Sequence, residues 1–260
     1  MTEQKIVFFD IDGTLLDNEK KIPKSTANAV KKLQENGVIT AIATGRAPFM
    51  FAHIREQLNI QTFVSFNGQY VVHNNEPVLK NPLSRKSLLS LEKKAADSGH
   101  PMAFLGTETM AANCNNHQYI IDSFKDLKIS PPLEDRMFHH HEDIYQALVF
   151  CEQKDKADYL NTERDFEYIR WHEYSMDVVP TGGSKAEGIK RLLNKLNIDV
   201  KNTYAFGDAL NDIEMLSFVQ HSFAMGNGMD EAKKAAKYVT KHVQEDGIYY
   251  GLQKAGLLNV

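Results

Sequence analysis

The sequence has little of what marks secreted, membrane-spanning or disulfide-bonded proteins. Only two of its 260 residues are cysteines, Cys114 and Cys151, and they form no CxxC pair. We therefore expect no disulfide framework, no zinc site and a reducing, cytoplasmic location. No apolar run approaches the roughly 20 residues that a membrane span needs. Residues 1–5 also lack the charged and apolar segments of a secretion signal.

An excess of basic charge is missing as well. The formal net charge is -4, because 30 lysines and arginines face 34 aspartates and glutamates. Nucleic acids and anionic membranes attract basic surfaces, so we expect neither as a partner. The motif GxxxxGK followed by Ser or Thr is absent too, which excludes an ordinary P-loop kinase.

What the chain does have is the composition of a globular protein, with 42% hydrophobic and 25% charged residues. Its length predicts one or two domains. The first and last thirds alternate between short apolar runs and amphipathic segments, which indicates a parallel, doubly wound, Rossmann-like α/β sheet. Strands are predicted at residues 6–9, 38–43, 62–66, 69–73, 203–206 and 222–225, and helices begin at Pro23 and Lys185.

The middle third follows another pattern. A helix at residues 84–98 precedes short strand-like pieces, which predicts an α+β unit inserted into the first domain. Turn-forming residues at 81–82 and 180–183 indicate two hinges. We therefore expect one domain from residues 1–81 and 184–260, and an inserted domain at 82–183. We interpret His139, His140 and His141 as an exposed loop rather than a metal site, because adjacent residues on an extended chain point to alternating sides.

The most informative residues are Asp10 and Asp12, which follow the apolar run at residues 6–9. Ligands of open α/β sheets bind beyond the carboxyl ends of the strands. Two carboxylates at such a place repel each other, and burial makes the repulsion stronger. A hard cation, or a reaction that needs an anionic oxygen and a proton carrier, would explain the pair.

Three further groups lie at predicted strand ends or helix starts: Thr44 with Gly45, Lys185, and the run from Asp208 to Asp212. A hydroxyl and backbone N–H groups at a helix start can hold a phosphate. With their carboxylates, amine and amide, these groups suit a magnesium ion beside a phosphoryl group. Each motif alone could be an ordinary turn or cap, and their joint occurrence in this order carries the prediction.

A calcium loop is the alternative for the DxDG motif. The EF-hand loop has glycine at its sixth position and glutamate at its twelfth. Counted from Asp10, Gly13 is fourth and Lys21 is twelfth. Calcium is therefore not expected.

With these motifs the chain resembles the haloacid dehalogenase superfamily, and within it the Cof-type, type IIB phosphatases with a C2 cap. The matching segments are residues 10–14, 44–46, 185 and 207–212, and residues 65–68 and 246–248 are also similar. The resemblance implies a catalytic core at 1–81 and 184–260 and a cap at 82–183.

The resemblance also implies roles for the individual residues. Asp10 would form an aspartyl-phosphate, and Asp12 would act as general acid and base. Mg²⁺ would be held by Asp10, the backbone carbonyl of Asp12, and Asp208, while Asp212 would orient Lys185 or a metal-bound water. The phosphoryl oxygens would be held by Thr44, Gly45, Lys185 and Asn211.

The function expected from this resemblance is magnesium-dependent hydrolysis of a small phosphate monoester, such as a sugar phosphate or a similar metabolite. A phosphomutase of the same superfamily is one alternative, and a non-catalytic protein that binds a phosphorylated metabolite is another. A phosphatase of nucleic acids fits less well, because of the net charge and the large insert. The substrate and the oligomeric state stay open.

Overall fold

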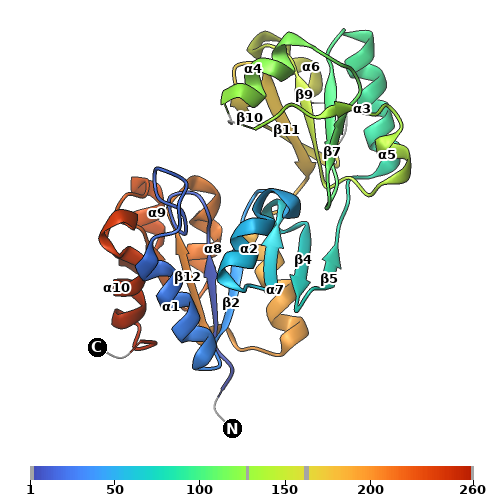
Figure 1. The fold of residues 1–260 in the computed structure, drawn as a ribbon. Coiled ribbons are helices and arrows are strands. Elements are labelled where there is room, and N and C mark those ends of the chain that lie inside the picture. Colours follow the sequence, from blue (N-terminus) through green and yellow to red (C-terminus); the bar gives the residue numbers. More distant parts are fainter. Residues whose placement is uncertain (1–2, 127–128, 161–163, 259–260) are drawn as a thin grey trace. The chain divides into compact units, whose positions relative to one another are not determined.

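The computed structural model describes residues 3–126, 129–160 and 164–258 (Figure 1). The chain divides into two compact units. The larger unit contains the described residues up to Arg46, from Met50 to Lys80 and from Ser184 onward. The smaller unit contains residues 47–49 and 81–183. Within the described ranges, no helix is long and apolar enough to cross a membrane.

An eight-stranded sheet forms the centre of the larger unit, with the strand order β14-β13-β12-β1-β2-β3-β4-β5. All neighbouring strands pair in parallel except β3 with β4 and β4 with β5. The strands are β1 (Ile6–Phe9), β2 (Ile39–Ala43), β3 (Thr62–Ser65), β4 (Tyr70–His73), β5 (Glu76–Lys80), β12 (Thr203–Gly207), β13 (His221–Ala224) and β14 (Tyr238–Val239).

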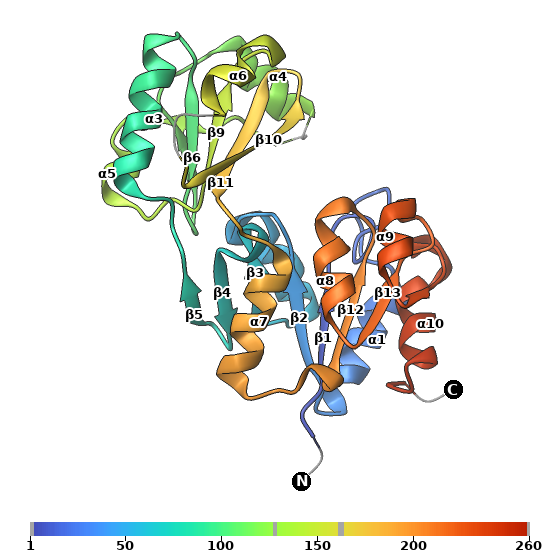
Figure 2. The same ribbon diagram turned by 180° about the vertical axis from the view of Figure 1, so that it is seen from behind.

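Helices cover both faces of this sheet, and every residue of its central strand β1 is therefore buried. Val7 and Phe9 join the core under α1 (Lys24–Glu35), α2 (Ala52–Leu58) and α10 (Gly247–Lys254). Ile6 and Phe8 join the core under α7 (Lys185–Leu196), α8 (Ile213–Phe218) and α9 (Asp230–Ala235), which lie on the near side in Figure 2. The predicted doubly wound α/β fold is confirmed.

The strand β5 is absent from the sequence prediction. Asn74 and Asn75 have φ angles of 50° and 64°, which suit a two-residue hairpin turn between β4 and β5. The strand itself reads Glu-Pro-Val-Leu-Lys and lies at the edge of the sheet. Proline and charged residues are tolerated at an edge, where one side of the backbone has no strand to pair with. The sequence of β5 therefore lacks the apolar alternation by which strands are predicted.

The smaller unit has a six-stranded, mostly antiparallel sheet in the order β10-β11-β9-β6-β7-β8. Leu88, Leu91 and Ala95 of helix α3 (Arg85–Asp97) pack on one face of it. The other elements are β6 (Met102–Leu105), β7 (Met110–Ala112), α4 (Gln118–Asp126), β8 (Leu133–Glu134), α5 (Phe138–His141), β9 (Gln146–Phe150), α6 (Lys156–Tyr159), β10 (Phe166–His172) and β11 (Ser175–Pro180).

The expectation of an exposed loop at residues 139–141 is wrong. These residues form the short helix α5, and His139 is only 2% exposed. Its ring stacks on Phe104 of the central strand β6 with a centroid distance of 4.3 Å. An aromatic ring is large enough to make a histidine part of a core. Only His141 of the three is exposed.

Candidate active site

Three neighbouring strands of the larger unit bring the predicted site residues to one edge of the sheet. Strand β1 pairs in parallel with β12 on one side and with β2 on the other. Asp10 follows β1 directly, Thr44 follows β2, and Asp208 follows β12. Since neighbouring parallel strands end at the same edge of the sheet, the backbones of these three residues occupy neighbouring positions along that edge.

A buried lysine joins two of the carboxylates. The Nζ atom of Lys185 lies 2.6 Å from Oδ1 of Asp10 and 2.7 Å from Oδ1 of Asp212. The side chains of Lys185 and Asp212 are completely buried. Lys185 is the first residue of α7, where the hydroxyl of Ser184 accepts the N–H of Glu187.

Two glycines allow this helix start to approach the β3–β4 connection. A side chain on Gly68, whose φ is +97°, would collide with the carbonyl of Ser184. A Cβ on Gly188 would lie 2.7 Å from Cα of Gly68. The close backbone contact therefore requires glycine at both positions, and it fixes where Lys185 enters the site.

The second oxygen of Asp212 organises the loop after β12. Oδ2 accepts the backbone N–H groups of Asp208 and Ala209, at 2.9 and 3.0 Å. A Cβ on Gly207 would lie only 2.6 Å from the carboxyl carbon of Asp212, so the strand end and this side chain touch. Asp212 thus holds Lys185 with one oxygen and the backbone of Asp208 with the other.

The Asp208 side chain is held from the loop after β1. Thr14 Oγ1 donates a hydrogen bond to Asp208 Oδ1 at 3.2 Å. A side chain on Gly13, whose φ is +78°, would collide with the carboxylate of Asp208. Asn227 secures this loop, since its amide donates to the carbonyl of Gly13 at 2.8 Å and its oxygen accepts the N–H of Val243.

Asp12 has different partners from the other carboxylates. Arg46 donates two hydrogen bonds to it, from Nε to Oδ2 at 2.8 Å and from a terminal nitrogen to Oδ1 at 2.6 Å. Lys20 donates a third to Oδ1 at 2.7 Å. Burial raises the pKa of Asp12, but the bonds from Lys20 and Arg46 outweigh burial and lower it. In this arrangement Asp12 is an anion.

The ionised forms of Asp10 and Asp208 are disfavoured, in contrast to that of Asp12. Burial raises the pKa of Asp10 to about 7, and the neighbouring carboxylates of Asp212 and Asp208 add to this against the opposing effect of Lys185. Burial and the carboxylate of Asp212 raise the pKa of Asp208 to about 6. Lys185 stays charged, because Asp10 and Asp212 raise its pKa despite the cost of burial.

The carboxylates fit a hard divalent cation. Asp10, Asp208 and Asp212 place ligand atoms within 4.8 Å of one another, with only one buried ammonium group among them. A second positive charge would relieve the repulsion that raises the pKa of Asp10 and Asp208. Both oxygens of Asp212 are already hydrogen-bonded within the protein, so Asp10 and Asp208 are better placed to hold the ion.

The remaining predicted phosphate ligands lie around Asn67. Thr44 is buried, and its hydroxyl accepts the N–H of Arg46 at 3.1 Å. A Cβ on Gly45 would lie 3.0 Å from the Asn67 side chain. Asn211 donates to the same side chain at 3.4 Å. The backbone N–H of Asn67 also donates to the carbonyl of Thr44 at 3.1 Å. Asn67 therefore lies next to all three residues, Thr44, Gly45 and Asn211.

Sequence reasoning did not assign roles to several residues that hold this site in place. Arg46 and Thr14 lie inside the motifs at residues 44–46 and 10–14, so the sequence does indicate that they are near the site. Asn227 lies in a Gly-Asn-Gly turn that has no distinctive spacing. Lys20 has no sequence signal at all, since only the fold brings it to Asp12.

Comparisons with known proteins identify the family of this chain. The family model of the haloacid dehalogenase-like hydrolases matches residues 7–252. Over 256 residues the chain is 43% identical to YkrA of Bacillus subtilis (strain 168), provisionally named a phosphatase, which covers 98% of this chain and 99% of that protein.

Two solved structures extend the comparison. A hypothetical protein from Geobacillus kaustophilus HTA426 is 51% identical with a TM-score of 0.96, over 98% of this chain and 100% of that chain. The subclass IIB sugar phosphatase BT4131 is 27% identical with a TM-score of 0.81, over 98% and 100%. The chain therefore belongs to the haloacid dehalogenase-like hydrolases and is a phosphatase of their Cof type.

Proposed function

We propose that this phosphatase hydrolyses a small phosphate monoester, such as a sugar phosphate, through an aspartyl-phosphate formed on Asp10. The observation that carries the proposal is the buried contact of 2.6 Å between Lys185 and Asp10 at the end of β1. It positions a carboxylate oxygen next to a fixed positive charge. Charge on the phosphoryl oxygens is what a phosphoryl-transfer site has to stabilise.

We assign the metal to Asp10, the backbone carbonyl of Asp12, and Asp208. Magnesium suits an oxygen-only ligand set and would supply positive charge beside the phosphoryl oxygens. Thr14 and Asp212 would keep Asp208 in place through the bonds described above. Thr44, Gly45, Lys185 and Asn211 would hold the non-bridging oxygens, with Asn67 positioning Gly45 and Asn211.

Asp12 is the proposed proton carrier. To protonate the leaving oxygen, it must take up a proton, which its bonds to Arg46 and Lys20 oppose. We propose that substrate binding exchanges these bonds, so that Asp12 turns from its cationic partners to the ester oxygen. After the first step the same carboxylate would accept a proton from the attacking water.

We propose that residues 82–183 act as a cap that selects the leaving group. The insert interrupts the chain between the Thr44 and Lys185 motifs, and it has its own sheet and core. A core that contacts only the phosphoryl group cannot distinguish one ester from another. Substitutions on the surface of the insert should therefore reorder a substrate panel by about 1–3 kcal/mol per contact.

The test is a panel of phosphorylated metabolites assayed for release of inorganic phosphate in magnesium, with excess chelator and with calcium as separate arms. We expect turnover in magnesium only, because calcium's higher coordination number would misplace the reacting oxygen. Undiminished activity in chelator would contradict the metal assignment. Transfer of phosphate within a sugar, without release, would instead identify a mutase.

A cytoplasmic location is part of the proposal. Cys114 and Cys151 are both free thiols, which suits a reducing compartment. Fractionation of cells that express the chain at native level is the check, and recovery in an extracellular fraction would contradict it.

A further inference from the structure

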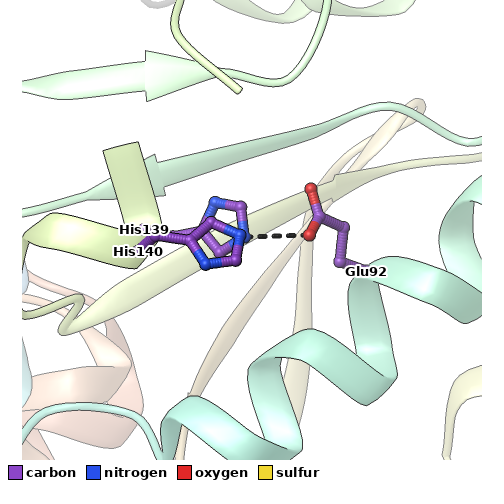
Figure 3. A group of neighbouring side chains, drawn as sticks. All are labelled: Glu92, His139 and His140. Carbon is purple, nitrogen blue, oxygen red and sulfur yellow. Dashed lines mark ion pairs between the residues drawn. The ribbon is translucent and has the colours of Figure 1, made fainter. Parts of the chain in front are cut away.

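The smaller unit contains a second group of metal-ligating side chains, which is unrelated to the carboxylates of the larger unit. Glu92 projects from α3 toward the two imidazole rings of His139 and His140 on α5 (Figure 3). One ligand atom from each residue lies within 4.8 Å of the other two. Two imidazoles and one carboxylate are a donor set typical of zinc and its neighbours.

The ring of His139 is buried and faces Glu92. Nε2 lies 2.9 Å from Oε2 of Glu92, a close contact without hydrogen-bond geometry. Among the described residues, Nδ1 has no hydrogen-bond partner. A buried polar atom without a partner is costly, and it marks a place where an ion or water is expected.

The three side chains also have the chemistry of metal ligands. An imidazole binds a metal through the lone pair of a ring nitrogen, and a carboxylate binds it through an ionised oxygen. Glu92 on α3 and the two histidines on α5 therefore offer one oxygen and two nitrogen donors at one place.

A path from solvent reaches the cluster. His139 lines a cavity of about 360 Å³ within the smaller unit, together with Arg85, Glu142 and Asp143. Glu92 and His140 are both partly exposed. An ion could therefore reach the three side chains without unfolding the unit, and a water molecule could complete its coordination.

We propose that Glu92, His139 and His140 bind one divalent transition-metal ion, zinc by preference, and that the ion links α3 to α5. Tetrahedral zinc holds its ligand atoms about 3.3 Å apart, given bonds of about 2.0–2.1 Å. The cluster reaches this spacing if the partly exposed Glu92 and His140 side chains adjust. Magnesium is disfavoured, because it selects oxygen ligands and octahedral geometry.

The ion would stabilise the smaller unit. Helix α5 is only four residues long, so its position depends on contacts such as the stack of His139 on Phe104. A metal bound by residues of both helices binds the folded unit and not the unfolded chain. Zinc should therefore raise the melting temperature, and the rise should depend on zinc concentration.

The test measures zinc binding to the full chain by equilibrium dialysis and calorimetry in excess magnesium, which occupies the oxygen-only site. Four proteins are compared: wild type, Glu92→Gln, His140→Gln and the control His141→Gln. His141 is the exposed neighbour outside the cluster. We expect one zinc ion in wild type and His141→Gln, and at least about tenfold weaker binding in the other two.

Cobalt substitution gives a second readout. Imidazole-containing tetrahedral cobalt should show visible absorption in wild type and His141→Gln, and this absorption should be lost in Glu92→Gln. Circular dichroism checks that each variant is folded. If the Glu92→Gln protein is not folded, the zinc affinity and cobalt absorption of the His140→Gln protein test the proposal instead. Equal zinc affinity in all four proteins, or no zinc binding by wild type, would overturn the proposal.

Discussion

The ammonium group of Lys185 lies 2.6 Å from the carboxylate of Asp10, and neither side chain is more than 9% exposed. The same ammonium reaches Asp212 at 2.7 Å. A single cation thus neutralises part of a carboxylate cluster that contains the buried Asp10 and Asp212 and the half-buried Asp208. The stability of the site and its chemistry depend on the same charge balance.

Replacement of Asp10 by asparagine should remove the proposed nucleophile while leaving the fold intact. The amide has nearly the same shape, but it is a far poorer nucleophile. We expect the rate of phosphate release to fall by at least about 10³-fold. Asp230→Asn, at an exposed helix start, is the matched control and should keep full activity. A highly purified Asp10→Asn protein that retains most of its activity would refute the role.

Replacement of Lys185 by methionine should destabilise the protein by about 3–5 kcal/mol, because Asp10 and Asp212 then stay buried without their cation. Urea unfolding without magnesium measures the loss. The difference in unfolding free energy between wild type and Lys185→Met should shrink as the pH falls from 7 to 5, because protonation removes the charges of Asp10 and Asp212. Lys190→Met, at a partly exposed position of the same helix, should change stability by less than about 0.5 kcal/mol. An equal loss in both variants would show that the buried contact contributes nothing.

In the metal-free protein, Asp10 and Asp208 should contribute stability that is lost as the pH rises from about 4 to about 7. Burial raises the pKa of Asp10 to about 7 and that of Asp208 to about 6. Unfolded carboxyls titrate near pH 4, so the native state binds more protons across this window and is favoured at its acidic end.

Magnesium should reverse this trend at its ligands, because it binds the deprotonated carboxylates. The rise in melting temperature caused by magnesium should therefore be larger at pH 8 than at pH 5. Thermal unfolding in magnesium and in chelator at each pH measures the difference. A magnesium effect that does not change with pH would contradict the assignment of Asp10 and Asp208 as ligands.

Replacement of Arg46 by glutamine should move one limb of the pH–rate profile. Arg46 and Lys20 hold the pKa of Asp12 low, and removal of the guanidinium should raise it. The limb of kcat/KM that reports Asp12 in the free enzyme should then move to higher pH. Arg55→Gln, elsewhere in the larger unit, is the control. A change in kcat with both limbs unmoved would mean that Arg46 acts on the substrate rather than on Asp12.

Sequence patterns predict best where local chemistry and the fold agree. The strand β1 has its predicted bounds, and Asp10 follows it directly. Lys185 starts its helix as expected, although its two carboxylate partners are 175 and 27 residues away in the sequence. Motif order could indicate that such residues meet, but not which oxygen each of them contacts.

The failures come from contacts between distant residues. His139 is buried because Phe104, on a strand more than thirty residues earlier, provides the surface on which its ring stacks. Lys20 becomes a partner of Asp12 only through the turn after β1. No periodicity or local motif encodes either relationship, and one sequence gives no record of which pairs vary together.

The contact between Gly68 and Ser184 has a consequence for how the chain folds. Strand β1 pairs with β12 across almost the whole sequence, so a continuous chain must close a very long loop to form the central sheet. Helix α7, which begins after Ser184, packs on the β3–β4 connection through Gly68 and Gly188. That contact brings the start of α7, which follows the insert, beside the β3–β4 connection, which precedes the insert. We expect it to form early and so shorten the loop that the β1–β12 pair must close. A bulky substitution at Gly68 should then slow refolding more than it speeds unfolding.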